Sequence, residues 1–145
     1  AIIDNQDSAA TVGFNVPLNW VPETSARGGS AAAKHITKKI ELVEPAVGLK
    51  IIFDAIRPNG SNFDVYYRTA EEGIDIRNVD FVYLPTESNN PTDENFTYRE
   101  YQYLAGGLGG DLREFTQFQI KIVMRSTNRV KTPVIKDLRV IALSV

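Results

Sequence analysis

The sequence predicts an all-β fold in which about seven or eight strands form a jelly-roll-like antiparallel sandwich of two sheets. From residue 34 onward, apolar and polar side chains alternate with the two-residue period of half-buried strands. Clusters of glycine, proline, asparagine and aspartate separate these alternating segments, as turns do. No segment carries the 3.6-residue apolar stripe of an amphipathic helix over three turns, so we expect no alternating βα fold.

The chain divides into an extended amino-terminal arm, residues 1–33, and a β-sandwich domain, residues 34–145. The arm is rich in proline, glycine and small residues and shows no sustained period, apart from a candidate short strand at residues 11–18. Its apolar residues, Trp20 among them, are too many for an idle linker. We therefore expect the arm to lie on the sandwich or on a neighbouring subunit, with residues 25–33 as its hinge.

Alternation and turn chemistry predict the first sandwich strands. Residues 36–42 alternate as a strand with one buried face, and residues 49–56, apolar on both faces, are expected to form a central strand. Proline and Asn-Gly within residues 57–61 predict a tight turn before the alternating segment 63–68. We predict that the strands on either side of this turn pair as an antiparallel hairpin.

The remaining strands are predicted in the same way, between an acidic loop, a polar loop, a glycine-rich connection and a final turn. They are residues 81–84, 96–104, 117–124 and 134–143. In the last of them, strict alternation places Val134 and Lys136 on the same face as Leu138. Apolar residues also occur on its other face, which predicts that its end is covered from both sides.

Composition limits the classes of function. Hydrophobic residues make up 43% and charged residues 23%, as in soluble globular domains. The net charge is −2 without a basic cluster, so we expect no nucleic-acid binding. Cysteine is absent, which excludes disulfides and thiolate chemistry, and no apolar run approaches the roughly 20 residues of a membrane span. The chain begins with Ala1, and we expect it to be a processed product or a piece of a longer protein.

Catalytic chemistry has few candidates in this sequence. His35 is the single histidine and lies at a strand entry, where a surface role is expected. Acidic residues cluster in one loop, as Glu71, Glu72, Asp75 and Asp80, and are candidates for a glycosidase pair or a calcium site. They lack regular calcium-ligand spacing, so a solvated turn is the leading interpretation. We predict no catalytic residue, no cofactor and no metal, and therefore no enzyme.

Aromatic residues supply the one candidate binding surface. Trp20, Tyr101 and Tyr103 are its members, and the two tyrosines share a strand face. Such a platform suits a sugar ring or a partner protein, but packing in the core or across strands explains most tyrosines at such positions. Core packing is the preferred interpretation, and the platform stays open as an alternative.

A resemblance to a known family is carried by residues 35–40, 48–50, 56–61, 65–68, 115–124, 126–128 and 132–143. These stretches of the sandwich resemble a domain of structural proteins from contractile-tailed, T-even-like marine phages. The similarity covers residues 34–143, and its closing part is the most specific. In that family the domain lies near the carboxyl end of tail- or baseplate-associated proteins, and it has no catalytic residues to carry over.

The resemblance implies a phage virion structural protein of the tail, baseplate or a related assembly, acting through protein–protein docking. Its expected partners are other virion proteins and further copies of itself in a symmetric oligomer. Its expected location is the virion, assembled in the cytoplasm of the bacterial host. The alternative is a receptor- or carbohydrate-binding sandwich of a tail fibre or spike, with a host-surface glycan as ligand.

Overall fold

The structure is a computed structural model. It describes residues 21–27, 29–31, 33–87, 89–106, 112–127 and 132–144 of the chain. The candidate strand at residues 11–18 and Trp20 lie outside the described residues.

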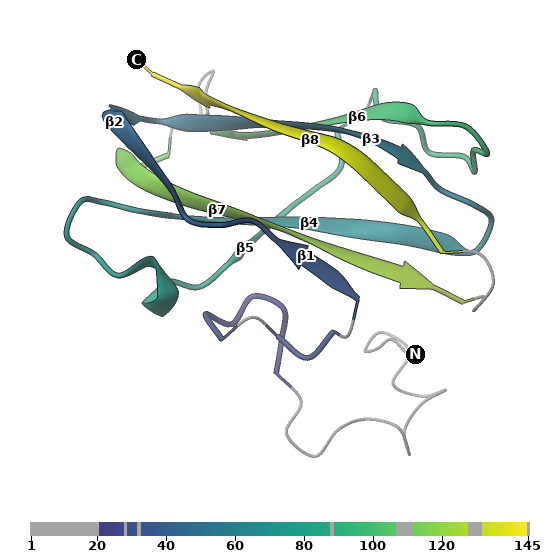
Figure 1. Ribbon diagram of the computed structural model, residues 1–145, viewed down its shortest axis with the longest axis horizontal. Helices are drawn as coiled ribbons and strands as arrows, with labels where there is room; N and C mark the ends of the chain where they lie inside the picture. Colours follow the sequence, from purple (N-terminus) through teal and green to yellow (C-terminus); the bar gives the residue numbers. More distant parts are fainter. Residues whose placement is uncertain are drawn as a thin grey trace.

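Among the described residues, eight strands form two antiparallel sheets that pack face to face (Figure 1). This confirms the predicted all-β sandwich. In chain order the strands are β1 (Lys34–Ile36), β2 (Ile40–Ala46), β3 (Gly48–Ile56), β4 (Ser61–Ala70), β5 (Val82–Leu84), β6 (Arg99–Gly106), β7 (Phe115–Ser126) and β8 (Val134–Leu143).

The two sheets are unequal in width. In the five-stranded sheet, β1 and β2 both pair with β7, and β4 and β5 follow on the other side of β7. The three-stranded sheet has the order β6-β3-β8. The chain passes from one sheet to the other in five connections: β2 to β3, β3 to β4, β5 to β6, β6 to β7 and β7 to β8. This repeated crossing joins the two sheets into one sandwich.

The predicted hairpin on either side of the Pro-Asn-Gly turn is wrong. β3 pairs with β6 and β8, whereas β4 pairs with β5 and β7 in the other sheet. The turn itself forms as expected, with Gly60 at φ 81° and the Ser61 N–H donating to the Pro58 carbonyl at 3.0 Å. Alternation in the sequence indicates which face of a strand is buried, and turn residues indicate where the chain reverses direction. Neither pattern identifies the strand with which a given strand pairs.

The core lies between the inner faces of the two sheets, where the predicted alternation holds. On central β3, the inward side chains from Leu49 to Ala55 are fully buried. Phe53 occupies the middle of this layer. Its ring stacks on Tyr101 and Tyr103, with centroids 5.8 and 5.7 Å away, and meets Phe63 edge-on at 5.3 Å.

Strict alternation fails in β8 because this strand contains a bulge. Asp137 has φ 55°, and the register against β3 shifts between Ile52 and Asp54. Ile135 before the bulge and Leu138 after it both pack against the core. Val134 is therefore exposed and does not share the inward face of Leu138, contrary to the prediction.

The strand predicted for residues 36–42 is divided in the structure. β1 ends at Ile36 and β2 begins at Ile40, and both pair with β7. Between them, the Thr37 hydroxyl accepts a hydrogen bond from the Ile120 N–H at 3.1 Å, which keeps the chain beside β7. Pro45 lies inside β2, and a proline without an N–H is tolerated there because β2 is an edge strand.

A single turn of 3₁₀ helix, η2 (Ile76–Asn78), interrupts the acidic loop between β4 and β5. The Asp75 side chain caps it by accepting the Arg77 N–H at 3.0 Å, and Ile76 is buried beneath it. Within the described residues, no helix is long and apolar enough to cross a membrane.

Candidate functional site

A buried lysine holds the described part of the arm against the sandwich. Lys121 on β7 points away from the core, yet its side chain is fully buried, because residues 21–27 and 29–31 lie over the outer face of the five-stranded sheet. Its ammonium donates to the Glu23 carbonyl and lies 3.0 Å from Glu23 Oε1. Lys34 Nζ lies 3.7 Å from the same carboxylate. We call Glu23, Lys34 and Lys121 the lysine clamp.

Arg68 on β4 reinforces the attachment beside the lysine clamp. Its guanidinium donates to Gln119 Oε1 at 2.6 and 2.8 Å and to the backbone carbonyls of Ala26 and Val79 at 3.1 Å each. The same group stacks over the Phe81 ring at 4.3 Å. One cation thus joins the arm, the acidic loop and two strands of the sheet.

Burial shifts the protonation equilibria of these groups in predictable directions. It lowers the pKa of Lys121 and of Arg68, because a charge is poorly solvated there. For Lys121 the hydrogen bond to Glu23 opposes this effect. Burial also raises the pKa of neighbouring Tyr66 to about 12. Since Lys121 has no exposed surface, its amine serves attachment and is not accessible as a nucleophile.

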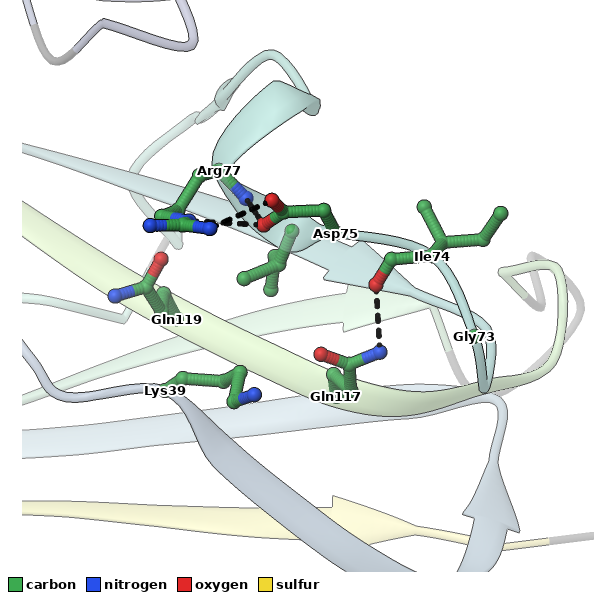
Figure 2. A pocket seen from close by; sticks show the side chains of 8 residues that line it. Lys39, Gly73, Ile74, Asp75, Arg77, Gln117 and Gln119 are labelled. Atoms are coloured by element: carbon green, nitrogen blue, oxygen red, sulfur yellow. Dashed lines mark hydrogen bonds and ion pairs between the residues drawn. The ribbon is translucent and has the colours of Figure 1, made fainter.

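A hollow of about 450 Å³ lies next to η2 on the outer side of the five-stranded sheet (Figure 2). It is lined by Lys39, Gly73, Ile74, Asp75, Ile76, Arg77, Gln117 and Gln119. Figure 2 shows Asp75 and Arg77 turned toward each other at its rim, joined at 2.9 and 3.0 Å. Hydrogen bonds from Arg77 lower the pKa of Asp75 to about 2, so this carboxyl is ionised at neutral pH.

The other polar groups of the hollow bind two segments beside it. Gln117 Nε2 donates to the carbonyls of Glu71 and Ile74 at 2.9 Å each, which fixes the acidic loop on the sheet. Gln119 Nε2 donates to the Thr37 carbonyl in the connection between β1 and β2. Lys39 Nζ lies 3.8 Å from a Glu41 carboxylate oxygen.

The clustered carboxylates of the acidic loop do not converge. Glu71 pairs with Arg113 at 2.5 Å, Asp75 with Arg77, and Asp80 accepts the Ala26 N–H at 3.1 Å. Across the part of the chain that the structure describes, no group of three or more acidic or histidine side chains is placed to hold a metal ion.

The tyrosines of the candidate binding surface lie in the core. Tyr101 is 2% exposed and Tyr103 is 3% exposed, and the Tyr101 hydroxyl donates to Asn95 Oδ1 at 3.2 Å. The face that they share points inward. These two tyrosines therefore pack in the core and do not form a surface platform. Trp20 lies outside the described residues. His35 is exposed on β1, where the sequence suggested a surface residue.

No protein-family model, curated protein or solved structure matches the chain. Its function must therefore be inferred from its own surfaces. Two surfaces of the three-stranded sheet are left open by the described residues. One is the outer face of the three-stranded sheet, and the other is the free edge of β8, residues 134–143, which we call the β8 edge.

The outer face of the three-stranded sheet carries exposed apolar side chains at both ends and charges in the middle. Its exposed apolar residues are Tyr98, Leu104, Val134 and Ile141. Register places Leu104 and Ile141 on either side of Lys50. Between the apolar ends, Arg139 lies 3.8 Å from carboxylate oxygens of both Asp54 and Glu100. Such a flat, mixed surface suits contact with another protein.

The two edge strands of this sheet differ in whether their outer backbone groups are hydrogen-bonded. On β6, the Asn90 side chain binds the Gln102 backbone like a neighbouring strand, accepting its N–H and donating to its carbonyl at 2.8 Å each. β8 pairs with β3 on one side, and among the described residues no strand pairs with its other side. The β8 edge therefore offers backbone groups for a further strand.

Sequence reasoning missed the lysine clamp. Lys121 has the sequence position of an ordinary outward-facing strand residue, and Glu23 lies in a segment without periodicity. A weak signal was present, because Arg68, Lys121 and Gln119 share the outward face of adjacent strands. Only the folded arm shows that these polar groups are covered.

Proposed function

We propose that this sandwich is a structural docking module of a phage virion protein, in the tail, baseplate or a related assembly. Its partners are other protein subunits of the particle. The virion setting comes from the resemblance in residues 34–143, and the mode of action comes from the surfaces described above. In this proposal the sandwich contributes shape and attachment.

The observation that carries the proposal is the open β8 edge. A ten-residue strand with one free side provides main-chain donors and acceptors for a partner, and such edges are usually capped or covered in isolated domains. Strand addition at a sheet edge is a common mode of protein recognition. The adjacent outer face adds exposed apolar groups, Ile141 among them, to the same attachment surface.

The charged groups of the molecule support the same interpretation. Lys121 and Arg68 are buried and committed to the arm, and Asp75 is held by Arg77. The alternative of a glycan-binding sandwich rested on Trp20, Tyr101 and Tyr103. The core covers the rings of the two tyrosines, and Trp20 lies outside the described residues. Docking uses a surface that is open, whereas these two tyrosines are not accessible to a glycan.

Site-specific cross-linking in assembled particles tests this proposal. The chain has no cysteine, so Ile141→Cys gives it a single thiol, beside the β8 edge, in the assembled phage. We expect a maleimide cross-linker to join it to a neighbouring virion subunit. Val82→Cys on β5 is the matched control, because Val82 and Ile141 are 47% and 49% exposed. Particles without the chain, or equal cross-linking from both positions, would contradict the proposal.

A further inference from the structure

The sandwich core is closed along β6 and open along β8. The inward side chains of β6, Tyr101, Tyr103 and Ala105, are all nearly inaccessible. On β8, Leu138 and Val140 also pack against the core but remain partly exposed. Both strands are edges of the same sheet, so this difference shows that the core is incompletely covered on the side of β8.

The opposite sheet does not close this side. β2 pairs with β7 near its two ends, at Ile40, Glu41 and Ala46, with a register shift between them. Leu42 in this interval is partly buried, and Val43 has an exposed fraction of 101%. Among the described residues, the three-stranded sheet has no strand beside β8, next to these partly covered apolar groups.

Residues 11–18 have the pattern that such a position requires. Val12, Phe14, Val16 and Leu18 alternate with Thr11, Gly13, Asn15 and Pro17. In a strand the four apolar side chains would share one face, as needed to cover Leu138 and Val140. Eight residues extend about 27 Å, within the length of ten-residue β8. Pro17 would lie on the polar face of an edge strand, where proline is tolerated.

The lysine clamp determines which copy can supply this strand. It fixes Glu23 on the outer side of the five-stranded sheet, whereas β8 lies in the other sheet (Figure 1). Leu18 is separated from Val21 by three residue steps, a span of about 10 Å at most. Packed sheets are themselves about 10 Å apart, and Val21 lies beyond one of them. The arm of the same chain is therefore too short to place residues 11–18 along β8.

We propose that residues 11–18 of one copy add as a strand to the β8 edge of a second copy. Backbone hydrogen bonds to β8 would supply affinity, and the apolar face of the added strand would cover Leu138 and Val140. Repetition of this contact around an axis joins copies into a symmetric ring or pair. The inference rests on the docking function proposed above and names a second copy as one partner.

Cross-linking between copies tests the pairing directly in the full chain. Asn15→Cys and Arg139→Cys each place one thiol on the outward face of the proposed strand pair. An isotope-labelled Arg139→Cys chain is mixed with unlabelled Asn15→Cys, and a bismaleimide product containing both is expected. A chain carrying both substitutions that cross-links only within itself would overturn the proposal, as would a monomer without either product.

A charge placed on either face of the segment tests its orientation. Two variants, Phe14→Asp and Asn15→Asp, are made in the cysteine-free chain, and sedimentation measures their oligomer populations. Phe14→Asp is expected to lower the oligomer population about tenfold or more, because a carboxylate would be buried against the core. Asn15→Asp adds a similar charge on the opposite face and is expected to retain the oligomer population. Equal behaviour of the two variants would overturn the proposal, while far-ultraviolet circular dichroism checks that each is folded.

The two proposals fail in different ways. If Ile141→Cys links the chain to other virion subunits but Asn15 and Arg139 never join two copies, docking stands and strand exchange is wrong. If two copies join in solution but purified particles lack the chain, the exchange is real and the virion function is wrong.

Discussion

The Glu23–Lys121 pair shows how one residue in the arm sets the state of a buried charge. An ammonium with no exposed surface is unfavourable unless its protons find acceptors, and Glu23 supplies both its carbonyl and its carboxylate. The same carboxylate accepts the Ala31 N–H at 2.7 Å, so it also orders the arm. Removing its charge should therefore affect the sandwich and the arm together.

Glu23→Gln is expected to lower the free energy of unfolding by about 2 kcal/mol, because Lys121 stays buried without a carboxylate. Urea unfolding with linear extrapolation measures the change. Glu44→Gln, at an exposed position on β2, makes the same chemical change and should leave stability within about 0.5 kcal/mol. Identical midpoints for both variants would show that the clamp contributes little.

Buried tyrosines and the buried lysine respond to alkaline pH in opposite directions. Burial raises the pKa of Tyr103 from 10.0 to about 12, so the unfolded chain releases this proton first. Its stabilising contribution is complete below pH 10 and is lost as pH rises to about 12. Burial lowers the pKa of Lys121 from 10.5, so here the unfolded chain binds more protons and stability rises with pH below 10.5.

Replacing one tyrosine separates these contributions. The free energy of unfolding is expected to fall between pH 10 and 12, and Tyr103→Phe should make that fall shallower. Tyr98→Phe, which removes the hydroxyl of an exposed ring, is the matched control. Chemical denaturation across this pH range checks the prediction, and parallel slopes for all three proteins would contradict it.

At the scale of elements, β6 ends where the backbone requires glycine. Gly106 has φ 71°, and a Cβ there would lie 2.6 Å from the Val47 carbonyl oxygen and 2.7 Å from Leu112 Cγ. Gly73, in the acidic loop, has φ 86° with open space around it. The first position combines backbone strain with a close approach of two segments, while the second has strain alone.

This contrast predicts unequal costs for the same substitution. Gly73→Ala should cost about 1 kcal/mol, from the left-handed conformation only. Gly106→Ala should cost about 3 kcal/mol or more, because the neighbouring backbone must also move. Thermal and urea unfolding of the two variants measure the difference, and equal costs would mean that the chain around Gly106 yields easily.

Element existence could be predicted from the sequence, whereas element partners could not. Two-residue alternation in segments such as 49–56 reflects burial, and burial is what the core requires. The pairing of β3 and β4 with other strands depends on long-range geometry that a local turn does not encode. The bulge at Asp137 shifted the inward face by one residue, because an aspartate at positive φ leaves no mark in the apolar pattern.

The candidate site was less predictable than the fold for a related reason. Tyr101 and Tyr103 have the same alternation whether their face points toward solvent or toward a second sheet. The pattern therefore could not distinguish a surface binding platform from packing in the core. The lysine clamp joins residues 98 positions apart, and no spacing rule connects them. Both depend on what covers a given face, which is a property of the assembled layers.

At the scale of the whole molecule, stability should concentrate where both sheets cover a side chain. Ile122 on β7 is almost completely buried at the centre, whereas Leu138 packs at the open side. Ile122→Ala is therefore expected to cost about 2–5 kcal/mol in the isolated chain, and Leu138→Ala about 2 kcal/mol or less. Val82→Ala, at an exposed position, should cost under about 0.5 kcal/mol.

Varying the protein concentration distinguishes contacts within one chain from contacts between copies in these variants. If a second copy covers Leu138, the destabilisation caused by Leu138→Ala grows with protein concentration, because the variant also loses the stabilisation that association provides. The destabilisation caused by Ile122→Ala should not grow with protein concentration in this way, since the Ile122 side chain is already covered within one chain. Unfolding curves measured across a wide concentration range would distinguish the two, and a concentration-independent cost for Leu138→Ala would place its contacts within a single copy.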